Sequence, residues 1–134
     1  WHYVRFEIHP DDLPAALALL HAKKFRGVNL TVPHKIIAFD RVAELDPAAR
    51  PVGAVNTLRW TERGWHGFNT DGYGLASAVQ ATLGRDLAGA HVILLGAGGA
   101  ARGAADTSSD GGDRPWYDDP PVDGDDDAGF AVRG

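Results

Sequence analysis

The chain has 134 residues, of which 44% are hydrophobic, and this is enough for one ordinary domain with a packed core. It contains no cysteine, which excludes a disulfide framework and a cysteine-based metal site. Since the absence of cysteine gives no sign of secretion, we take a cytoplasmic protein as the default expectation. We expect no membrane partner, because no apolar run approaches the ~18 residues that a spanning helix needs.

The net charge of -5 is unevenly distributed along the chain. Residues 1–105 carry eleven Lys and Arg against nine Asp and Glu, a balance of +2, whereas residues 106–134 carry two Arg against nine Asp, a balance of -7. The first region has no basic stripe interleaved with aromatic residues. We therefore expect no nucleic-acid partner, and we find no pattern that predicts a metal site.

The chain opens with a predicted strand at residues 3–8, followed by a helix that Asp11 or Asp12 could cap. Three leucines at i, i+4 and i+7 give this helix one apolar face: Leu13, Leu17 and Leu20.

A second strand is predicted over residues 27–32, because apolar and polar residues alternate there. Its apolar members are Val28, Leu30 and Val32, and its polar members are Asn29 and Thr31. Pro33 ends the strand, since it cannot donate to a sheet ladder. Lys35 is thus placed at the carboxyl end of a strand, where open α/β sheets collect substrates.

The next predicted element is a helix over residues 34–45, with Ile37, Ala38 and Val42 on its inward face. Asp46 and Pro47 end this helix. Residues 53–60 and 65–69 predict a β-hairpin, and residues 72–83 predict a helix.

A short apolar run at residues 91–95 has the character of a buried parallel strand and leads directly into glycines. Gly96, Ala97, Gly98, Gly99, Ala100 and Ala101 follow the G-x-G-x-x-A pattern of a dinucleotide site. After Ala105 the periodicity ends, and residues 106–134 are predicted to be disordered. Their Asp, Gly, Pro and Arg bias is also what GC-rich coding DNA gives when read out of frame, so a frameshift near Ala105 is a hypothesis.

Four segments carry a resemblance, and they occur in this order: residues 27–35, 53–57, 67–72 and 96–102. Together they resemble the shikimate dehydrogenase family over about residues 3–105. The resemblance implies an α/β fold, with a substrate-binding domain at 1–85 whose sheet is mixed and mainly parallel. It implies the first strand and Gly-rich turn of a Rossmann domain at 86–105, and it leaves 106–134 as an acidic tail. We expect the chain to be an internal fragment.

The resemblance also implies an activity, the reversible NADPH-dependent reduction of 3-dehydroshikimate to shikimate, in the biosynthesis of chorismate and the aromatic amino acids. Matched residue by residue, Lys35 is the catalytic acid/base and Asp71 its partner, and both contact the substrate. Thr31 and Asn56 match further substrate contacts. A lysine beside an aspartate suits this chemistry, because the carboxylate fixes the ammonium that must donate a proton.

The cofactor implied is NADP, with Gly96, Ala97, Gly98, Gly99 and Ala100 at its pyrophosphate. The family's element that selects NADP over NAD follows the next strand and has no match here, so this choice rests on the resemblance alone. A homodimer is compatible with the family.

Each of these residues has a simpler interpretation. Asp71 could cap the helix after it, Asn56 could satisfy a backbone group at a strand end, and Thr31 could be a β-branched strand residue. His34, which has no role in the family, is interpreted as a helix-start residue. At the level of the protein, the alternatives are a quinate/shikimate dehydrogenase that uses NAD, a non-catalytic remnant that binds a polyhydroxy acid or a protein partner, and an acidic interaction tail.

We expect the 134-residue chain by itself to have little or no dehydrogenase activity, since the Gly-rich turn has no matching pocket for the adenosine. The measurement is NADP reduction by the purified chain with shikimate, and steady turnover would contradict the expectation.

Overall fold

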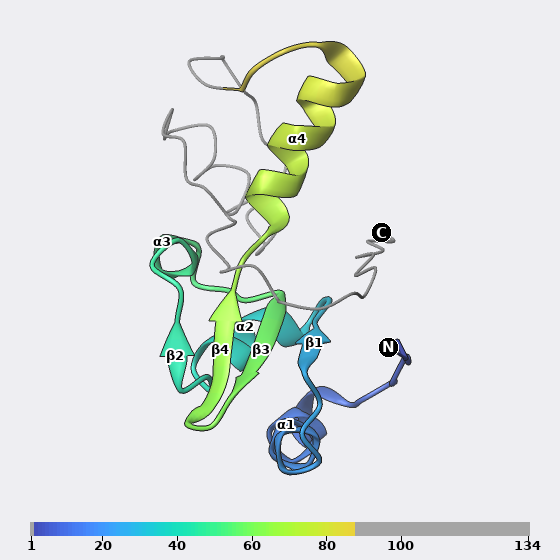
Figure 1. The fold of residues 1–134 in the computed structure, drawn as a ribbon, viewed down its shortest axis with the longest axis vertical. Coiled ribbons are helices and arrows are strands. Elements are labelled where there is room, and N and C mark those ends of the chain that lie inside the picture. Colours follow the sequence, from blue (N-terminus) through green and yellow to red (C-terminus); the bar gives the residue numbers. More distant parts are fainter. Residues whose placement is uncertain (1, 88–134) are drawn as a thin grey trace, which may run out of the picture.

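The computed structural model describes residues 2–87, and these fold as an α/β unit (Figure 1). In chain order the elements are η1 (Pro10–Asp12), α1 (Leu13–Ala22), β1 (Gly27–Asn29), α2 (His34–Phe39), β2 (Glu44–Leu45), α3 (Ala49–Val52), β3 (Thr57–Thr61), β4 (Gly64–Phe68) and α4 (Asp71–Leu83). The predicted α/β class is therefore confirmed for this part of the chain.

The sheet has four strands in the order β1-β3-β4-β2. β3 pairs antiparallel with both β1 and β4, and only β2 and β4 are parallel. The sheet is mixed, as predicted, but the prediction that it is mainly parallel is wrong for the described residues. The reason is the hairpin of β3 and β4, which occupies the centre of the sheet, where a tight turn permits only antiparallel pairing.

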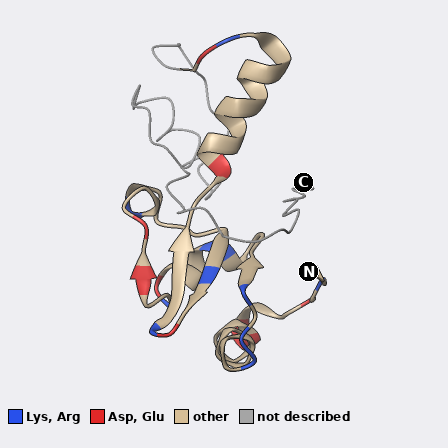
Figure 2. Cartoon of the chain, in the orientation of Figure 1, with Lys and Arg blue, Asp and Glu red and all other residues tan. Residues whose placement is uncertain are grey.

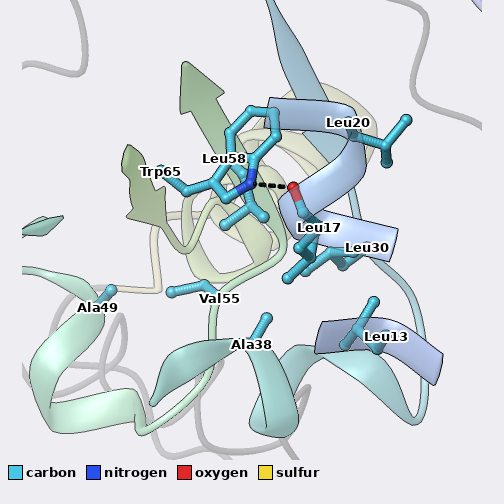
Figure 3. Packing of buried hydrophobic residues seen from close by; sticks show 9 residues of the cluster. All are labelled: Leu13, Leu17, Leu20, Leu30, Ala38, Ala49, Val55, Leu58 and Trp65. Atoms are coloured by element: carbon cyan, nitrogen blue, oxygen red, sulfur yellow. Dashed lines mark hydrogen bonds between the residues drawn. The ribbon is translucent and has the colours of Figure 1, made fainter. Parts of the chain in front are cut away.

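The hydrophobic core lies between α1, α2 and one face of the sheet (Figure 3). The three leucines of α1 are buried, which confirms the predicted apolar face of that helix. Leu58 of β3 and Trp65 of β4 meet them from the sheet, because alternate residues of a strand share a face. The indole Nε1 of Trp65 donates a hydrogen bond of 2.9 Å to the carbonyl of Leu17, so helix and sheet are also joined by a buried polar contact.

Residues 3–8 form no strand with the described part of the chain, which corrects the first prediction. Their β-branched and aromatic composition suits a strand, but a strand exists only where its backbone groups pair with a neighbour. Tyr3, Val4 and Phe6 are instead largely exposed.

The segment after β1 also differs from its prediction. The strand stops at Asn29, and Val32 is 75% exposed rather than buried. The peptide bond between Val32 and Pro33 is cis. α2 ends at Phe39 instead of continuing to residue 45, because the chain turns back there to place β2 beside β4.

The hairpin and the following helix are confirmed, but the first hairpin strand, predicted from residue 53, begins only at Thr57, because Gly53 ends α3 in a left-handed conformation. β3 and β4 pair from Thr57 with Phe68 to Thr61 with Gly64, and α4 begins one residue earlier than expected. α1 follows η1 and carries Asp12 at its N-cap position, but no side-chain cap hydrogen bond forms there. The predicted strand at residues 91–95 and the acidic tail lie outside the described residues. Among residues 2–87, no helix is long and apolar enough to cross a membrane.

Replacing Leu17 with Ala should lower the free energy of unfolding by about 2–5 kcal/mol, because this side chain is 4% exposed at the centre of the core. Leu19, on the same helix, is 59% exposed and serves as the matched control, for which a change within about 0.5 kcal/mol is expected. Urea unfolding of the two variants is the measurement, and equal losses would contradict this assignment of the core.

Candidate active site

One end of the sheet gathers the polar residues that the sequence singles out. β1 and β4 finish at this end and β3 starts there, since Asn29 lies opposite Thr57 and Thr57 lies opposite Phe68. α4 leaves from the same end and carries an acidic residue in its first turn (Figures 1 and 2). Side chains from four separate segments can therefore meet here.

Lys35 and Asp71 form an ion pair at this end of the sheet. The Lys35 Nζ lies 2.7 Å from the Asp71 Oδ2, and the two side chains are only 15% and 22% exposed. Lys35 is the second residue of α2, and Asp71 is the first of α4, where the positive end of the helix dipole favours a carboxylate. Asp71 does not cap α4 with its side chain, so the simpler interpretation of this residue is not supported.

Asn56 completes the group. Its Nδ2 donates to the second Asp71 oxygen, Oδ1, over 2.8 Å, and to the Thr70 hydroxyl over 2.9 Å. The Asp71 carboxylate therefore has one oxygen held by an ammonium and the other by an amide. The main chain reinforces the arrangement, because the Val55 N–H donates to the Lys35 carbonyl at 3.0 Å.

The polar contacts continue along the sheet away from the ion pair. Thr57 Oγ1 donates to Asn56 Oδ1 at 3.0 Å and accepts from Asn29 Nδ2 at 3.2 Å. Asn29 Oδ1 in turn accepts from the Tyr3 hydroxyl at 3.3 Å. A continuous row of hydrogen bonds thus runs from an exposed tyrosine to the lysine.

Asn69 was not predicted as a site residue, although it lies within the segment 67–72 that carries part of the family resemblance. Asn69 is 6% exposed, its Nδ2 donates to the Ala54 carbonyl, and its Oδ1 accepts from the Asp71 N–H. An asparagine two residues before a helix start is a recognised signal for a side chain that bonds the backbone two residues on. That signal could have identified it.

Gly53 and Gly67, in the segments 53–57 and 67–72, occupy positions where the backbone geometry favours glycine. Gly53 ends α3 with a φ of 65°, a left-handed conformation that turns the chain toward Asn56. A Cβ on Gly67 would lie 2.9 Å from a methyl group of Val55 and 3.0 Å from one of Val42, so a larger residue would fit only if these neighbours or β4 shifted.

The other predicted residues are not brought into this group. Thr31 is exposed between β1 and α2, and among the described residues its hydroxyl makes no hydrogen bond with Lys35 or Asp71. His34 is the first residue of α2, as predicted, and its Nδ1 is buried without a hydrogen-bond partner in the described part of the chain. The predicted cofactor residues Gly96, Ala97, Gly98, Gly99 and Ala100 lie outside the described residues.

The face of the sheet opposite the core carries a second polar group. Arg59 Nη2 lies 3.3 Å from His66 Nδ1 and its guanidinium lies over the Phe68 ring, while Glu44 approaches His66 to 3.8 Å. Burial lowers the pKa of His66 below its usual 6.5, and the positive charge of Arg59 lowers it further. Glu44 acts in the opposite direction and raises it.

Lys and Arg positions and Asp and Glu positions are interspersed along the described elements (Figure 2). Within residues 2–87, no cluster of three or more His, Cys, Asp or Glu side chains is placed to hold a metal ion.

Residues 2–87 thus form an α/β domain that carries a partly buried lysine–aspartate ion pair at the end of its sheet. Residues 1–58 match the family model described as the shikimate dehydrogenase substrate binding domain. The chain belongs to the shikimate dehydrogenase family.

Individual relatives agree with this assignment. The NADP-dependent shikimate dehydrogenase of Anaeromyxobacter sp. strain Fw109-5 is 52% identical over 105 residues, which are 77% of this chain and 36% of that protein. The structure of shikimate 5-dehydrogenase from Thermus thermophilus with shikimate matches with a TM-score of 0.70 and 38% identity, over 77% of this chain and 39% of that one. The 5-ketofructose reductase of Gluconobacter sp. strain CHM43 matches with a TM-score of 0.68 and 33% identity, over 77% and 36% of the two chains. The chain thus spans little more than a third of the length of these proteins.

Replacing Arg59 with Gln should raise the pKa of His66, because it removes a positive charge, and replacing Glu44 with Gln should lower it. NMR titration of the His66 ring protons measures both shifts. Two shifts in the same direction would contradict the stated causes.

The lowered pKa of His66 also determines how this residue makes the free energy of unfolding depend on pH. The unfolded chain binds a proton at His66 more readily than the folded chain does, so the contribution of His66 to stability is complete above about pH 6.5. It is lost as the pH falls through the folded-state pKa. The difference in unfolding free energy between the parent and a His66→Gln variant should shrink over that acid range.

Proposed function

We propose that this chain carries the substrate-binding part of an NADP-dependent shikimate dehydrogenase, which reversibly reduces 3-dehydroshikimate to shikimate. The observation that carries the proposal is the half-buried pair of Lys35 and Asp71, whose charged groups are 2.7 Å apart at the end of the sheet. The relatives named for this activity match the segments that supply the pair. Reduction of this ketone would place the protein in the biosynthesis of chorismate and the aromatic amino acids.

The chemistry needs a hydride at the carbonyl carbon and a proton at the carbonyl oxygen. The bound nicotinamide supplies the hydride. Lys35 supplies the proton, and in the reverse direction its neutral amine accepts the proton of the substrate hydroxyl. Asp71 does not transfer a proton in this scheme. Its carboxylate keeps the Lys35 Nζ at one position, which is the geometric requirement for efficient proton transfer.

Asn56 and Thr31 complete the proposed substrate contacts in different ways. The Asn56 Nδ2 donates to Asp71 and to the Thr70 hydroxyl, so it would bind a substrate hydroxyl beside that carboxylate by exchanging the bond to Thr70 for one to the substrate. The exposed hydroxyl of Thr31 can bind a substrate that lies over the loop between β1 and α2. Several such polar contacts suit a ring that carries several hydroxyl groups.

The cofactor and the domain limits belong to the same proposal. Gly96, Ala97, Gly98, Gly99 and Ala100 would hold the pyrophosphate of NADP, as part of a domain that begins near residue 86 and follows a substrate domain over residues 1–85. Support comes from the G-x-G-x-x-A pattern and from the names of the relatives.

Replacing Lys35 with Met should lower kcat by about 10²–10⁴-fold, the usual contribution of a general acid, and should change KM much less. The test protein is a chimera in which the matching 105 residues of this chain replace those of the Anaeromyxobacter relative. Initial rates with NADPH and 3-dehydroshikimate give kcat and KM.

The matched control is Lys23→Met, which removes an exposed lysine at the end of α1 and should leave both constants unchanged. An unchanged kcat in Lys35→Met would remove Lys35 from its assigned role. A chimera that reduces 5-ketofructose but not 3-dehydroshikimate would overturn the proposed substrate and keep the proposed chemistry.

A further inference from the structure

Asn69 is the one buried polar or charged residue among those the structure describes. Both halves of its amide are used: Nδ2 donates to the Ala54 carbonyl at 2.9 Å, and Oδ1 accepts from the Asp71 N–H at 3.0 Å. Ala54 lies two residues before Asn56, and Asn69 lies two residues before Asp71. A single side chain therefore joins the two segments that carry Asn56 and Asp71.

Asn56 makes the reciprocal connection. Its Oδ1 accepts from the Thr70 N–H at 3.0 Å, and its own N–H donates to the Phe68 carbonyl at 2.9 Å. The register of β3 and β4 ends with the pair of Thr57 and Phe68. Beyond that pair, the side-chain amides of Asn56 and Asn69 form hydrogen bonds that link residues 54–57 to residues 68–71.

We propose that Asn69 is a positioning residue that holds the Asp71 carboxylate at the Lys35 ammonium. It acts through the main chain of Asp71 and does not touch the substrate. The consequence for catalysis rests on the proposed function, whereas the effect on the ion pair does not.

Removal of the Asn69 amide would leave two backbone groups without their hydrogen-bond partner. The buried Ala54 carbonyl and the partly buried Asp71 N–H would lose their partner, which is costly, so the loop is expected to move toward other partners. A hydrogen bond between charged groups weakens steeply when its distance or angle changes. The pair of Lys35 and Asp71 should therefore weaken although neither residue is altered.

The first test is a double-mutant cycle in the 134-residue chain. Unfolding free energies of the parent, Lys35→Met, Asp71→Asn and the double variant give the coupling energy of the pair. The same cycle is measured with Asn69→Ala, and with Asn69→Ser, which is a milder change. We expect the coupling to fall by at least half in both backgrounds.

The control is Trp65→Phe, which also removes a buried donor from a backbone carbonyl, that of Leu17. This variant should lower stability and leave the coupling of Lys35 with Asp71 intact. Coupling that is unchanged by both Asn69 replacements would overturn the proposal, whatever the enzyme activity. If an Asn69 variant of the chain does not fold, its cycle is measured in the chimera with kcat as the readout.

The second test is kinetic and uses the chimera. Asn69→Ala should lower kcat at least tenfold in the parent and have little further effect in Lys35→Met, because both changes disable the same pair. Equal effects in the two backgrounds would indicate a merely structural role and contradict the proposal. A parent chimera without activity would refute the proposed function, and the coupling measured in the chain would still decide the role of Asn69.

Discussion

The arrangement of the candidate site depends on how two short segments, 54–57 and 68–71, are held where the hairpin ladder ends. Sheet hydrogen bonds position residues only up to Thr57 and Phe68. Past that point, two asparagine side chains hold the segments together with the main-chain bonds from Val55 to Lys35 and from Asn56 to Phe68. The position of the partly buried ion pair thus depends on backbone geometry, and the loss of either partner would be costly for the charge that remains.

The two faces of the sheet have different surroundings, an apolar core on one side and a polar and aromatic group on the other. On one face, the leucines of α1 pack against Leu58 and Trp65 and provide most of the buried apolar contact. On the other face, Arg59, His66 and Phe68 form a polar and aromatic group. The candidate site lies at neither face but at the end of the strands, where backbone groups are free to be bonded by side chains. This separation lets the core remain apolar while the site remains polar.

Local patterns predicted much of this structure, and long-range pairing accounts for the rest. The leucine spacing of α1, the hairpin and α4 depend on neighbouring residues, and these predictions are confirmed. The direction of the strands and the absence of pairing at residues 3–8 depend on partners far along the chain, which composition does not encode. Within the site, the motifs identified Lys35, Asn56 and Asp71, which the structure brings together. Asn69 was missed because its role lies in backbone bonds, which a search for reactive side chains passes over.

The position of Asp71 at the very start of α4 gives the site a mechanical property. α4 has 13 residues, so at about 1.5 Å per residue it is an arm of about 20 Å. Gly72 is the only one of its residues that is buried among the described parts of the chain, so the arm is anchored at its first turn. A tilt of about 10° around that turn would swing the far end by roughly 3–4 Å and leave the carboxylate almost in place. The near end of α4 would thus act as a pivot, so a tilt of the helix moves the Asp71 carboxylate far less than it moves the other end of the helix.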